Sequence, residues 1–292
     1  MVQDHEFQLQ ATKNISILLP TRGRGELAFS SLQSLVTHAD EPEKIEFLIA
    51  LDHDDQESQQ YFVENILPWF DEKNLDLTVY TTPRYGYVGL HNYNNFLAAR
   101  CSGSWVVFWN DDAVMQSDGW DTEILKHNGR FELLAFDTHH AHPYSIFPIL
   151  PRDWLILFEK LSDHQQNDAW VSQIAYMADC FKRIPITVLH DRADLTGNNM
   201  DKTYAEREYR EGDLADPLDI NHPAVHARKV HWATKVVWLR KLIGQDTGWF
   251  DKAMRGEVDM WQKMKDNDIN NQIMVVDTKN GTTKYGPQAE NS

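Results

Sequence analysis

The sequence predicts an α/β fold with a Rossmann-like, mainly parallel sheet flanked by helices. Short apolar runs, which are typical of buried strands, alternate with segments of helical periodicity along the first half of the chain. The order strand, helix, strand, helix belongs to parallel sheets with helices on both faces. The chain has 292 residues, of which 42% are hydrophobic, and this supplies a large core.

The expected elements follow from apolar runs for strands and from spacings of three and four residues for helices. Four strands come first, at residues 15–19, 45–51, 75–80 and 105–109, with helices between them at 26–38, 58–69 and 91–101. We expect Pro20 to stop the first strand. A helix at 117–128, a strand at 131–136, helices at 154–161 and 169–181 and a strand at 184–189 come next. A polar loop at 195–223 precedes C-terminal helices at 228–242 and 250–266 and a frayed tail at 278–292.

Polar clusters follow three of the first four expected strands. They are Thr21-Arg22-Gly23-Arg24, the segment from Asp52 to Asp55, and Asn110-Asp111-Asp112. Ligands of parallel sheets bind beyond the carboxyl ends of the strands, so these clusters should lie along one ligand-binding edge. A carboxylate such as Asp112 at a strand end can offer oxygen to a hard divalent cation beside a diphosphate.

The charge balance excludes some classes of function. The chain has 44 acidic and 28 basic residues, which gives a net charge of −16 and argues against non-specific nucleic-acid binding.

Its two cysteines, Cys101 and Cys180, are expected to be buried, reduced thiols. The sequence shows no secretory signal pattern and no apolar run of membrane-spanning length, so we predict a cytoplasmic protein without a membrane span.

The segment from Gly89 to Asp112 resembles the GT-A-fold glycosyltransferases of family 2. In that family a glycine, an Arg-Asn pair early in a helix, a small residue plus Gly, an apolar strand and a D-x-D motif follow one another. The matching residues here are Gly89, Asn95, Ser102-Gly103, residues 105–109 and Asn110-Asp111-Asp112. Asn94 replaces the Arg and Asn110 replaces the first Asp, and Asp112 keeps the second. Residues 17–24 resemble the opening strand and the P-T-x-N-R turn of the family, with Gly23 in place of Asn.

The resemblance implies a GT-A-type sheet with a C-terminal helical extension, and it implies roles for individual residues. The implied donor-nucleotide contacts come from Pro20, Thr21, Arg22, Arg24, Asp52, Asp54, Gly89, Asn95, Asn110 and Asp111. Asp52 stands for the Asp at the end of the second strand that accepts from the uracil or other base in the family, and Asp54 or Asp55 could share that role. Asp112 and His190 are the implied ligands of Mn²⁺ or Mg²⁺, and neutral imidazole suits Mn²⁺ better than Mg²⁺.

The second half is expected to bind the acceptor. Asn167-Asp168 matches the acidic pair at a helix start in the family, with Asn167 in place of Glu, and Asp168 is then the general base of an inverting reaction. An ordinary helix cap is the other interpretation of Asp168. His139, His140 and His142 fit no zinc signature and are interpreted as acceptor-pocket or structural residues. For the C-terminal tryptophans Trp232, Trp238, Trp249 and Trp261, helix packing is favoured over sugar stacking.

These observations predict a metal-dependent transferase that moves a sugar from a nucleoside diphosphate sugar, most simply a UDP-sugar, to an acceptor hydroxyl. The acceptor could be a glycan, a small molecule or a modified nucleobase. A nucleotidyltransferase and a non-catalytic nucleotide-sugar or carbohydrate-binding protein are the alternatives. The expected GT-A domain covers residues 1–224, with a donor half at about 15–112 and an acceptor half at about 113–224, and the extension and tail cover 225–292.

Overall fold

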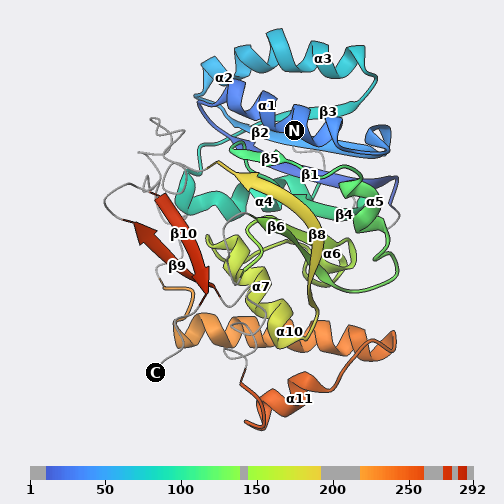
Figure 1. The fold of residues 1–292 in the computed structure, drawn as a ribbon, viewed down its shortest axis with the longest axis vertical. Coiled ribbons are helices and arrows are strands. Elements are labelled where there is room, and N and C mark those ends of the chain that lie inside the picture. The colour runs from blue at the N-terminus through green and yellow to red at the C-terminus, as the bar shows by residue number, and fades with distance from the viewer. Residues whose placement is uncertain (1–10, 139–143, 192–217, 260–271, 278–281, 288–292) are drawn as a thin grey trace.

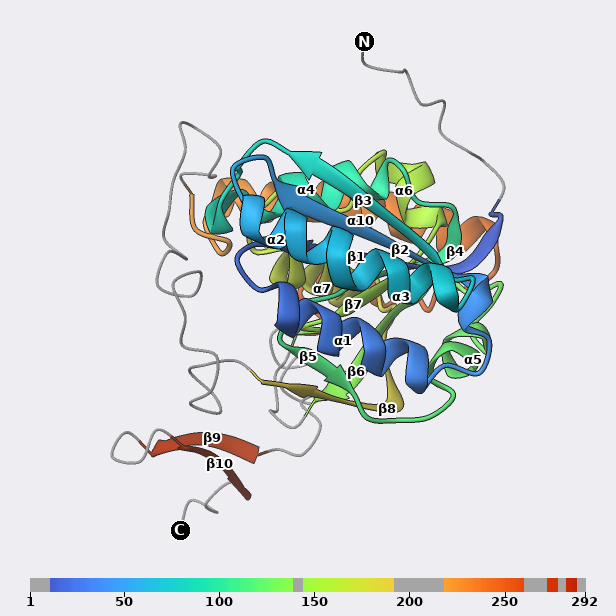
Figure 2. The same ribbon diagram turned by 90° about the horizontal axis from the view of Figure 1, so that it is seen from above.

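The computed structural model of the chain describes residues 11–138, 144–191, 218–259, 272–277 and 282–287. The strands of its main sheet are β1 (Lys13–Thr21), β2 (Ile45–Asp52), β3 (Asp76–Thr82), β4 (Gly103–Phe108), β5 (Ala113–Met115), β6 (Leu133–Thr138), β7 (Pro148–Pro151) and β8 (Phe181–His190). They lie in the order β3-β2-β1-β4-β7-β6-β8-β5. Helices flank this eight-stranded sheet (Figures 1 and 2), which confirms the predicted α/β class.

The helices fall close to their expected positions. They are α1 (Gly25–Thr37), α2 (Gln56–Tyr61), α3 (Leu67–Glu72), α4 (Leu90–Ala98), α5 (Trp120–Leu125), α6 (Asp153–Phe158), α7 (Asn167–Met177), α10 (Pro223–Leu242) and α11 (Trp249–Met254). A π-helical turn, Phe62–Ile66, joins α2 to α3 within the expected helix 58–69. Within the described ranges, no helix combines the length and the apolar character needed to cross a bilayer.

Side chains of the central strand β1 alternate between two cores, one on each face of the sheet. Ile17 and Leu19 belong to the core that contains residues of α1, α3 and α5. Leu18 belongs to the core that contains residues of α4, α6, α7 and α10. All three side chains have 0% exposure, as expected for a strand covered on both faces.

The expectation that Pro20 ends the first strand is wrong. Strand β1 runs on to Thr21, and Pro20 pairs with Ala50 of β2. On its other side, β1 pairs with β4 only as far as Leu18. Proline lacks an N–H group and is tolerated where a strand has a free side, so the ladder to β2 continues through Pro20.

Strands β5 and β7 were not expected, and they make the second half of the sheet mixed. The β7 strand lies inside the Pro-rich segment after the histidine cluster and runs antiparallel to both β4 and β6. Its two prolines, Pro148 and Pro151, are its terminal residues. The β5 strand has only three residues, Ala113–Met115, and pairs antiparallel with the end of β8. Both strands are too short to show periodicity in the sequence.

Gly103, in the motif Ser102-Gly103, is required by the close approach of β4 to β1. A Cβ atom at Gly103 would lie 2.5 Å from the backbone nitrogen of Ser16. The Gly103 N–H donates to Ser16 Oγ over 2.8 Å and to the buried Glu46 carboxylate over 3.1 Å. The small-residue-plus-Gly element therefore allows the close spacing of β1, which ends at Thr21, and β4, which Asn110 follows.

The C-terminal region differs from the expectation. The first helix, α10, begins earlier than predicted, at Pro223, because His222 caps it through the N–H of Ala224. The second, α11, ends at Met254, close to Gly256 with its left-handed φ of 72°. A frayed tail is the wrong description of residues 282–287, which form β10 (Thr282–Pro287) paired with β9 (Gln272–Asp277). Residues 192–217, which include most of the expected polar loop, and 260–271 lie outside the described residues.

Candidate functional site

The ends of β1 and β4 meet at one edge of the sheet, and a hydrogen bond joins the polar clusters that follow them. Thr21 Oγ1 donates to Asp111 Oδ2 over 2.7 Å. Ser31 of α1 stabilises the loop that carries Asp111, because its hydroxyl donates to the carbonyls of Asn110 and Ala113. Two of the three polar clusters thus share one rigid edge, because parallel strands bring their carboxyl ends together.

Asp112 and His190 lie side by side because β5 pairs with β8. The register places Ala113 opposite His190, and the Asp191 N–H donates to the Asp112 carbonyl over 2.8 Å. His190 Nε2 lies 3.2 Å from Asp112 Oδ1, and both side chains are buried. Within the described part of the chain, neither Asp112 Oδ1 nor either His190 ring nitrogen has a hydrogen-bond partner.

Buried polar atoms are rarely left unpaired, so these atoms indicate a missing partner. A carboxylate oxygen and an imidazole nitrogen are a donor set that suits Mn²⁺. Asp112 and His190 therefore fit the predicted metal. No third His, Cys, Asp or Glu joins them as a ligand among the residues that the structure describes. A cation held by these two side chains would need further oxygen ligands from outside the described residues, and such cations commonly keep water among them.

Arg24 balances the two adjacent carboxylates of the Asn110-Asp111-Asp112 segment. Its Nη1 lies 3.0 Å from Asp111 Oδ1 and 3.7 Å from Asp112 Oδ2. Burial and the neighbouring Asp112 carboxylate raise the pKa of Asp111 to about 6, although Arg24 and Thr21 oppose the rise. Asp111 thus makes its contacts to Thr21 and Arg24 and organises the loop, while Asp112 Oδ1 remains available to a ligand.

The turn after β1 explains one departure from the family pattern. Gly23, which replaces Asn, has a left-handed φ of 64°. Glycine and Asn are the residues that adopt this conformation most readily, so the exchange preserves the turn. The Gly23 N–H donates to Asp55 Oδ2 over 2.7 Å, and Asp55 also caps α2 through the N–H of Ser58. Asp55 therefore supports the turn, and its sharing of the nucleobase-binding role of Asp52 stays a prediction.

Asp52 and Asp54 form a second cluster with Arg22 at the end of β2. Arg22 Nη1 lies 3.1 Å from Asp52 Oδ2 and 2.5 Å from Asp54 Oδ1. Asp52 is buried and also accepts a hydrogen bond from the hydroxyl of Tyr93. Burial raises the pKa of Asp52 in spite of Tyr93 and Arg22, whereas the hydrogen bond from Arg22 lowers the pKa of the exposed Asp54.

Two residues of this second cluster were missed in the sequence. Tyr93, on α4, accepts hydrogen bonds from the backbone N–H groups of Tyr85 and Gly86 and donates to Asp52. Arg84 lies 3.8 Å from Asp54. No local pattern marks either residue, since they approach Asp52 only when β3 and α4 pack beside β2.

Gly89 and Asn95, which the family resemblance implies as donor contacts, differ in where the structure places them. Gly89 is buried and directly precedes α4. Asn95 does not join either cluster through its side chain. Its Oδ1 accepts from the Leu161 and Ser162 N–H groups, and its Nδ2 donates to the Ser162 carbonyl over 2.8 Å. Asn95 therefore holds the loop after α6 against α4, which is a structural role different from the implied donor contact.

Asp168 lies in the first turn of α7, two residues after the N-cap residue. Its Oδ1 accepts from the N–H of Ala169 over 2.8 Å, and the cap residue is Gln166. The side chain is partly exposed, and no contact among the described residues joins it to either cluster. His139, His140 and His142 lie outside the described residues, so their predicted roles are untested.

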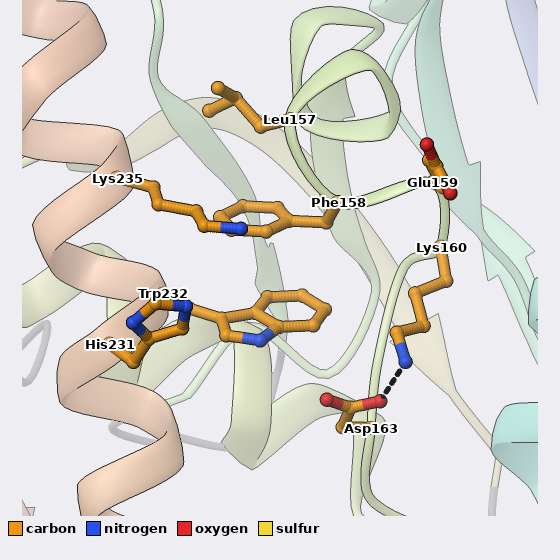
Figure 3. Close-up of a pocket in the computed structure, with 8 residues that line it drawn as sticks. All are labelled: Leu157, Phe158, Glu159, Lys160, Asp163, His231, Trp232 and Lys235. Atoms are coloured by element: carbon orange, nitrogen blue, oxygen red, sulfur yellow. Dashed lines mark ion pairs between the residues drawn. The ribbon is translucent and has the colours of Figure 1, made fainter.

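A cavity of about 310 Å³ lies between α6 and α10, and none of the predicted site residues lines it (Figure 3). Its aromatic side chains, Phe158 and Trp232, stack on each other with ring centres 4.0 Å apart and are both buried. Trp232 also contacts Trp154 and Trp170, which supports helix packing for this tryptophan. Trp238 differs, because it is 60% exposed on α10. Trp261 lies outside the described residues.

No protein-family model and no curated protein matches the sequence. Its structure is similar to the mannosyltransferase PcManGT from Pyrobaculum calidifontis in complex with GDP-Man and Mn²⁺, with a TM-score of 0.53 and 13% identity over 88% of this chain and 81% of that one. The chain has a GT-A fold. TarS from S. aureus with UDP-GlcNAc (TM-score 0.48, 15% identity, 88% and 80% coverage) is a weaker match to the same fold.

The GT-A fold places both clusters of polar residues on one edge, with Asp112 and His190 at β4, β5 and β8 and Asp52 and Arg22 at β1 and β2. The two clusters are electrostatically different. The first combines three ionisable carboxylate or imidazole groups with one Arg, and the second pairs Asp52 and Asp54 with Arg22 and Arg84.

We expect the variant Asp52→Asn to raise the KM for a nucleotide donor about 10-fold or more, with a smaller change in kcat. A hydrogen bond to a charged group contributes about 1.5–3 kcal/mol, and its loss in both ground and transition states raises KM. Because burial raises the pKa of Asp52, donor affinity should also fall on acidification at a higher pH than for an ordinary Asp. Steady-state kinetics over a pH series measures both effects. Asp76→Asn, at the opposite end of β3, is the control, and an unchanged KM for Asp52→Asn would make Asp52 a structural residue.

Proposed function

We propose that this chain transfers a sugar from a nucleoside diphosphate sugar to an acceptor hydroxyl and that the transfer depends on Mn²⁺ or Mg²⁺. The observation that carries the proposal is the buried side-by-side placement of Asp112 and His190 next to Arg24 at the carboxyl edge of the sheet, where the facing atoms of Asp112 and His190 have no hydrogen-bond partner among the described residues. The GT-A fold supports it, since the mannosyltransferase with the same fold is described in complex with GDP-Man and Mn²⁺.

In this proposal different residues of the sheet edge bind different parts of the donor. Asp52, held by Tyr93 and Arg22, accepts hydrogen bonds from the nucleobase, which we take to be uracil. Arg24 offers positive charge to the diphosphate, and its guanidinium is fixed by Asp111 before the donor arrives. Asp112 and His190 hold the metal ion, which when bound supplies charge neutralisation to the leaving diphosphate. Such preorganised charge is the largest contribution to catalysis in most sites of this kind.

Asp168 is the proposed general base on the acceptor side. It takes the proton of the acceptor hydroxyl as that oxygen attacks the anomeric carbon, and direct displacement inverts the anomeric centre. The carboxylate is partly exposed and lies in the first turn of α7, where the positive end of the helix dipole favours its ionised form. We accordingly propose residues 15–112 as the donor half, 113–224 as the acceptor half and 225–292 as an extension.

A donor panel tests the proposal. The purified chain is incubated with Mn²⁺ and one donor at a time, taken from UDP-sugars, GDP-sugars and nucleoside triphosphates. The released nucleotide is measured by mass spectrometry. We expect release of a nucleoside diphosphate from a sugar nucleotide, with transfer to water where no acceptor is supplied. Calorimetry with UDP and GDP, with and without Mn²⁺, measures binding independently of turnover.

The alternatives give different results in the same panel. Release of pyrophosphate from a nucleoside triphosphate would favour a nucleotidyltransferase. Metal-dependent nucleotide binding without turnover of any donor would favour a non-catalytic binding protein, to which the exchange of the first Asp of the D-x-D motif for Asn110 also points.

A further inference from the structure

Helix α10 lies in a basic stretch of an acidic chain. Between Asp219 and Asp246 the sequence contains five basic residues and no acidic one, whereas the whole chain has a net charge of −16. This stretch includes all of α10. Helices α10 and α11 form one end of the molecule, and α2 and α3 form the opposite end (Figure 1). The chain therefore has a local excess of positive charge along α10.

One face of α10 is buried, and the other exposes large apolar side chains. Trp232 and Val236 belong to the core that contains residues of α7. On the outer face, Trp238 is 60% exposed, and Leu242, about one helical turn further on, is 64% exposed. Ile243, directly after the helix, is 44% exposed. We call Trp238, Leu242 and Ile243 the apolar patch. Exposed patches of this kind mark sites where a protein meets a partner or a membrane.

Helix α11 adds to the same end of the molecule. Lys241 Nζ lies 2.9 Å from Asp251 Oδ2, and this ion pair ties the end of α10 to α11. Met254 follows Asp251 by three residues, about one turn, and is 62% exposed. The other exposed lysines of the two helices are Lys235 and Lys252, and no carboxylate of a described residue pairs with either of them. Their positive charges therefore stay available at this surface.

Lys235 lies about one helical turn before Trp238 and has an amphipathic environment. Its ammonium group is 5.7 Å from the ring centre of Phe158 (Figure 3). The cavity beside it contains two carboxylates, of which that of Asp163 pairs with Lys160. A lysine in such a place can keep its methylene stem against apolar groups while its ammonium group reaches the level of lipid phosphates.

The combination of positive charge and apolar exposure selects the kind of partner. Two copies of the chain that met through this face would bring two positive stretches together, which is unfavourable. A nucleic acid would match the charge, but its phosphate backbone offers no apolar layer for Leu242 and Ile243. The interface of an anionic bilayer offers negative headgroups together with an apolar layer, and Trp is enriched at such interfaces.

We propose that the outer face of α10 binds the surface of an anionic membrane, with the apolar patch in the headgroup region and Lys235 at the level of the lipid phosphates. The binding is peripheral, because the opposite face of α10 remains in the protein core. An acidic molecule approaches a negative surface with its basic end, so the charge distribution also orients the protein. This inference goes beyond the proposed transfer reaction and does not depend on it.

Vesicle flotation tests the apolar contribution. The full chain is mixed with vesicles of phosphatidylcholine, with and without phosphatidylglycerol, and the fraction that floats with the lipid is measured. We expect binding to the anionic vesicles, with a partition coefficient about 3- to 10-fold lower for Trp238→Ser and for Leu242→Ser, because each variant buries less apolar surface in the headgroup region. Val63→Ser is the matched control, since Val63 is 62% exposed on the turn between α2 and α3.

A second pair of variants tests the electrostatic contribution. Lys235→Gln should lower the partition coefficient about 5-fold, because one lysine near an anionic surface contributes about 1 kcal/mol. Lys126→Gln, an exposed lysine after α5, should leave it unchanged. Added salt should weaken the binding of the wild type by screening. The substituted side chains are largely exposed, so the Tm of each variant should match that of the wild type and exclude misfolding.

Four outcomes would overturn the inference. They are no flotation of the wild type with anionic vesicles, equal flotation with neutral vesicles, and equal flotation of the wild type, Trp238→Ser and Leu242→Ser. The fourth is an oligomer in light scattering that the same two substitutions dissociate, which would assign the patch to contact between copies. Flotation is measured without a donor, so its failure leaves the proposed transferase function untouched. A chain that floats as expected but turns over no donor would overturn only that function.

Discussion

Replacing Asp112 by Asn lowers donor turnover about 10²–10³-fold, the usual cost of removing one preorganised electrostatic contact to a developing charge. The substitution exchanges a carboxylate for a weakly coordinating amide at the position that pairs with His190. Chelation of the wild type with EDTA should abolish turnover to the same or a greater extent, and Mn²⁺ should restore it. Initial rates with the active donor, measured before and after chelation, give both effects.

Binding and stability measurements separate this effect from misfolding. Asp112 Oδ1 and the His190 ring nitrogens have no hydrogen-bond partner among the described residues, so the neutral variant should unfold at a Tm no lower than that of the wild type. Mn²⁺ should raise the Tm of the wild type by mass action and leave that of Asp112→Asn unchanged. His190→Gln should behave like Asp112→Asn, and Asp118→Asn, an exposed acid, should behave like the wild type. Full turnover in EDTA would contradict the proposed metal dependence.

Replacing Asp168 by Asn lowers kcat about 10²–10⁴-fold, the usual contribution of a general base. Asparagine keeps the size of the side chain but cannot take the proton of the acceptor hydroxyl. Donor KM, Mn²⁺-dependent nucleotide binding and Tm should stay close to the wild-type values, because Asp168 makes its one described hydrogen bond to the neighbouring Ala169 N–H. The wild-type product should carry the inverted anomeric configuration, which NMR of the isolated product determines.

Asp153→Asn is a matched control for this variant. Asp153 occupies the first turn of α6, as Asp168 occupies the first turn of α7, so both substitutions change the helix dipole interaction in the same way. Only the Asp168→Asn substitution should lower the rate of transfer. A product with retained configuration, or a kcat of Asp168→Asn close to that of the wild type, would return Asp168 to the role of an ordinary helix-terminus acid.

The carboxyl edge of the sheet could be predicted because its signals are local. Apolar runs that end in Thr21, Asp52 and Asn110 mark strands of a parallel sheet, and topology then brings these ends together. The prediction for Pro20 was wrong because it used only the local sequence. Whether a strand can contain a proline depends on which neighbouring strand pairs with it at that residue. A local sequence pattern indicates whether a residue favours a strand, but it does not show on which side that strand lacks a neighbour.

The contacts of the site that could not be predicted depend on antiparallel pairing and on helix packing. Asp112 and His190 were both proposed as ligands, but their closeness results from the three-residue strand β5, which leaves no periodicity to detect. Tyr93 and Arg84 reach Asp52 and Asp54 from elements that neighbour β2 only in space. Conversely, Asn95 matches the family motif in order and spacing, yet its amide is bound by the loop after α6.

The alternation of β1 between two cores means that the two polar clusters of the sheet edge are supported from opposite faces. Ile17 and Leu19 face the core shared with α1, whose Ser31 supports the loop that carries Asp111, while Leu18 faces the core shared with α4, α6, α7 and α10. A substitution that repacks α10 against α7 is transmitted first within its own face of the sheet. Such a change would reach Tyr93 of α4, which lies in that same core and holds Asp52, before it reaches Ser31 on the other face of the sheet.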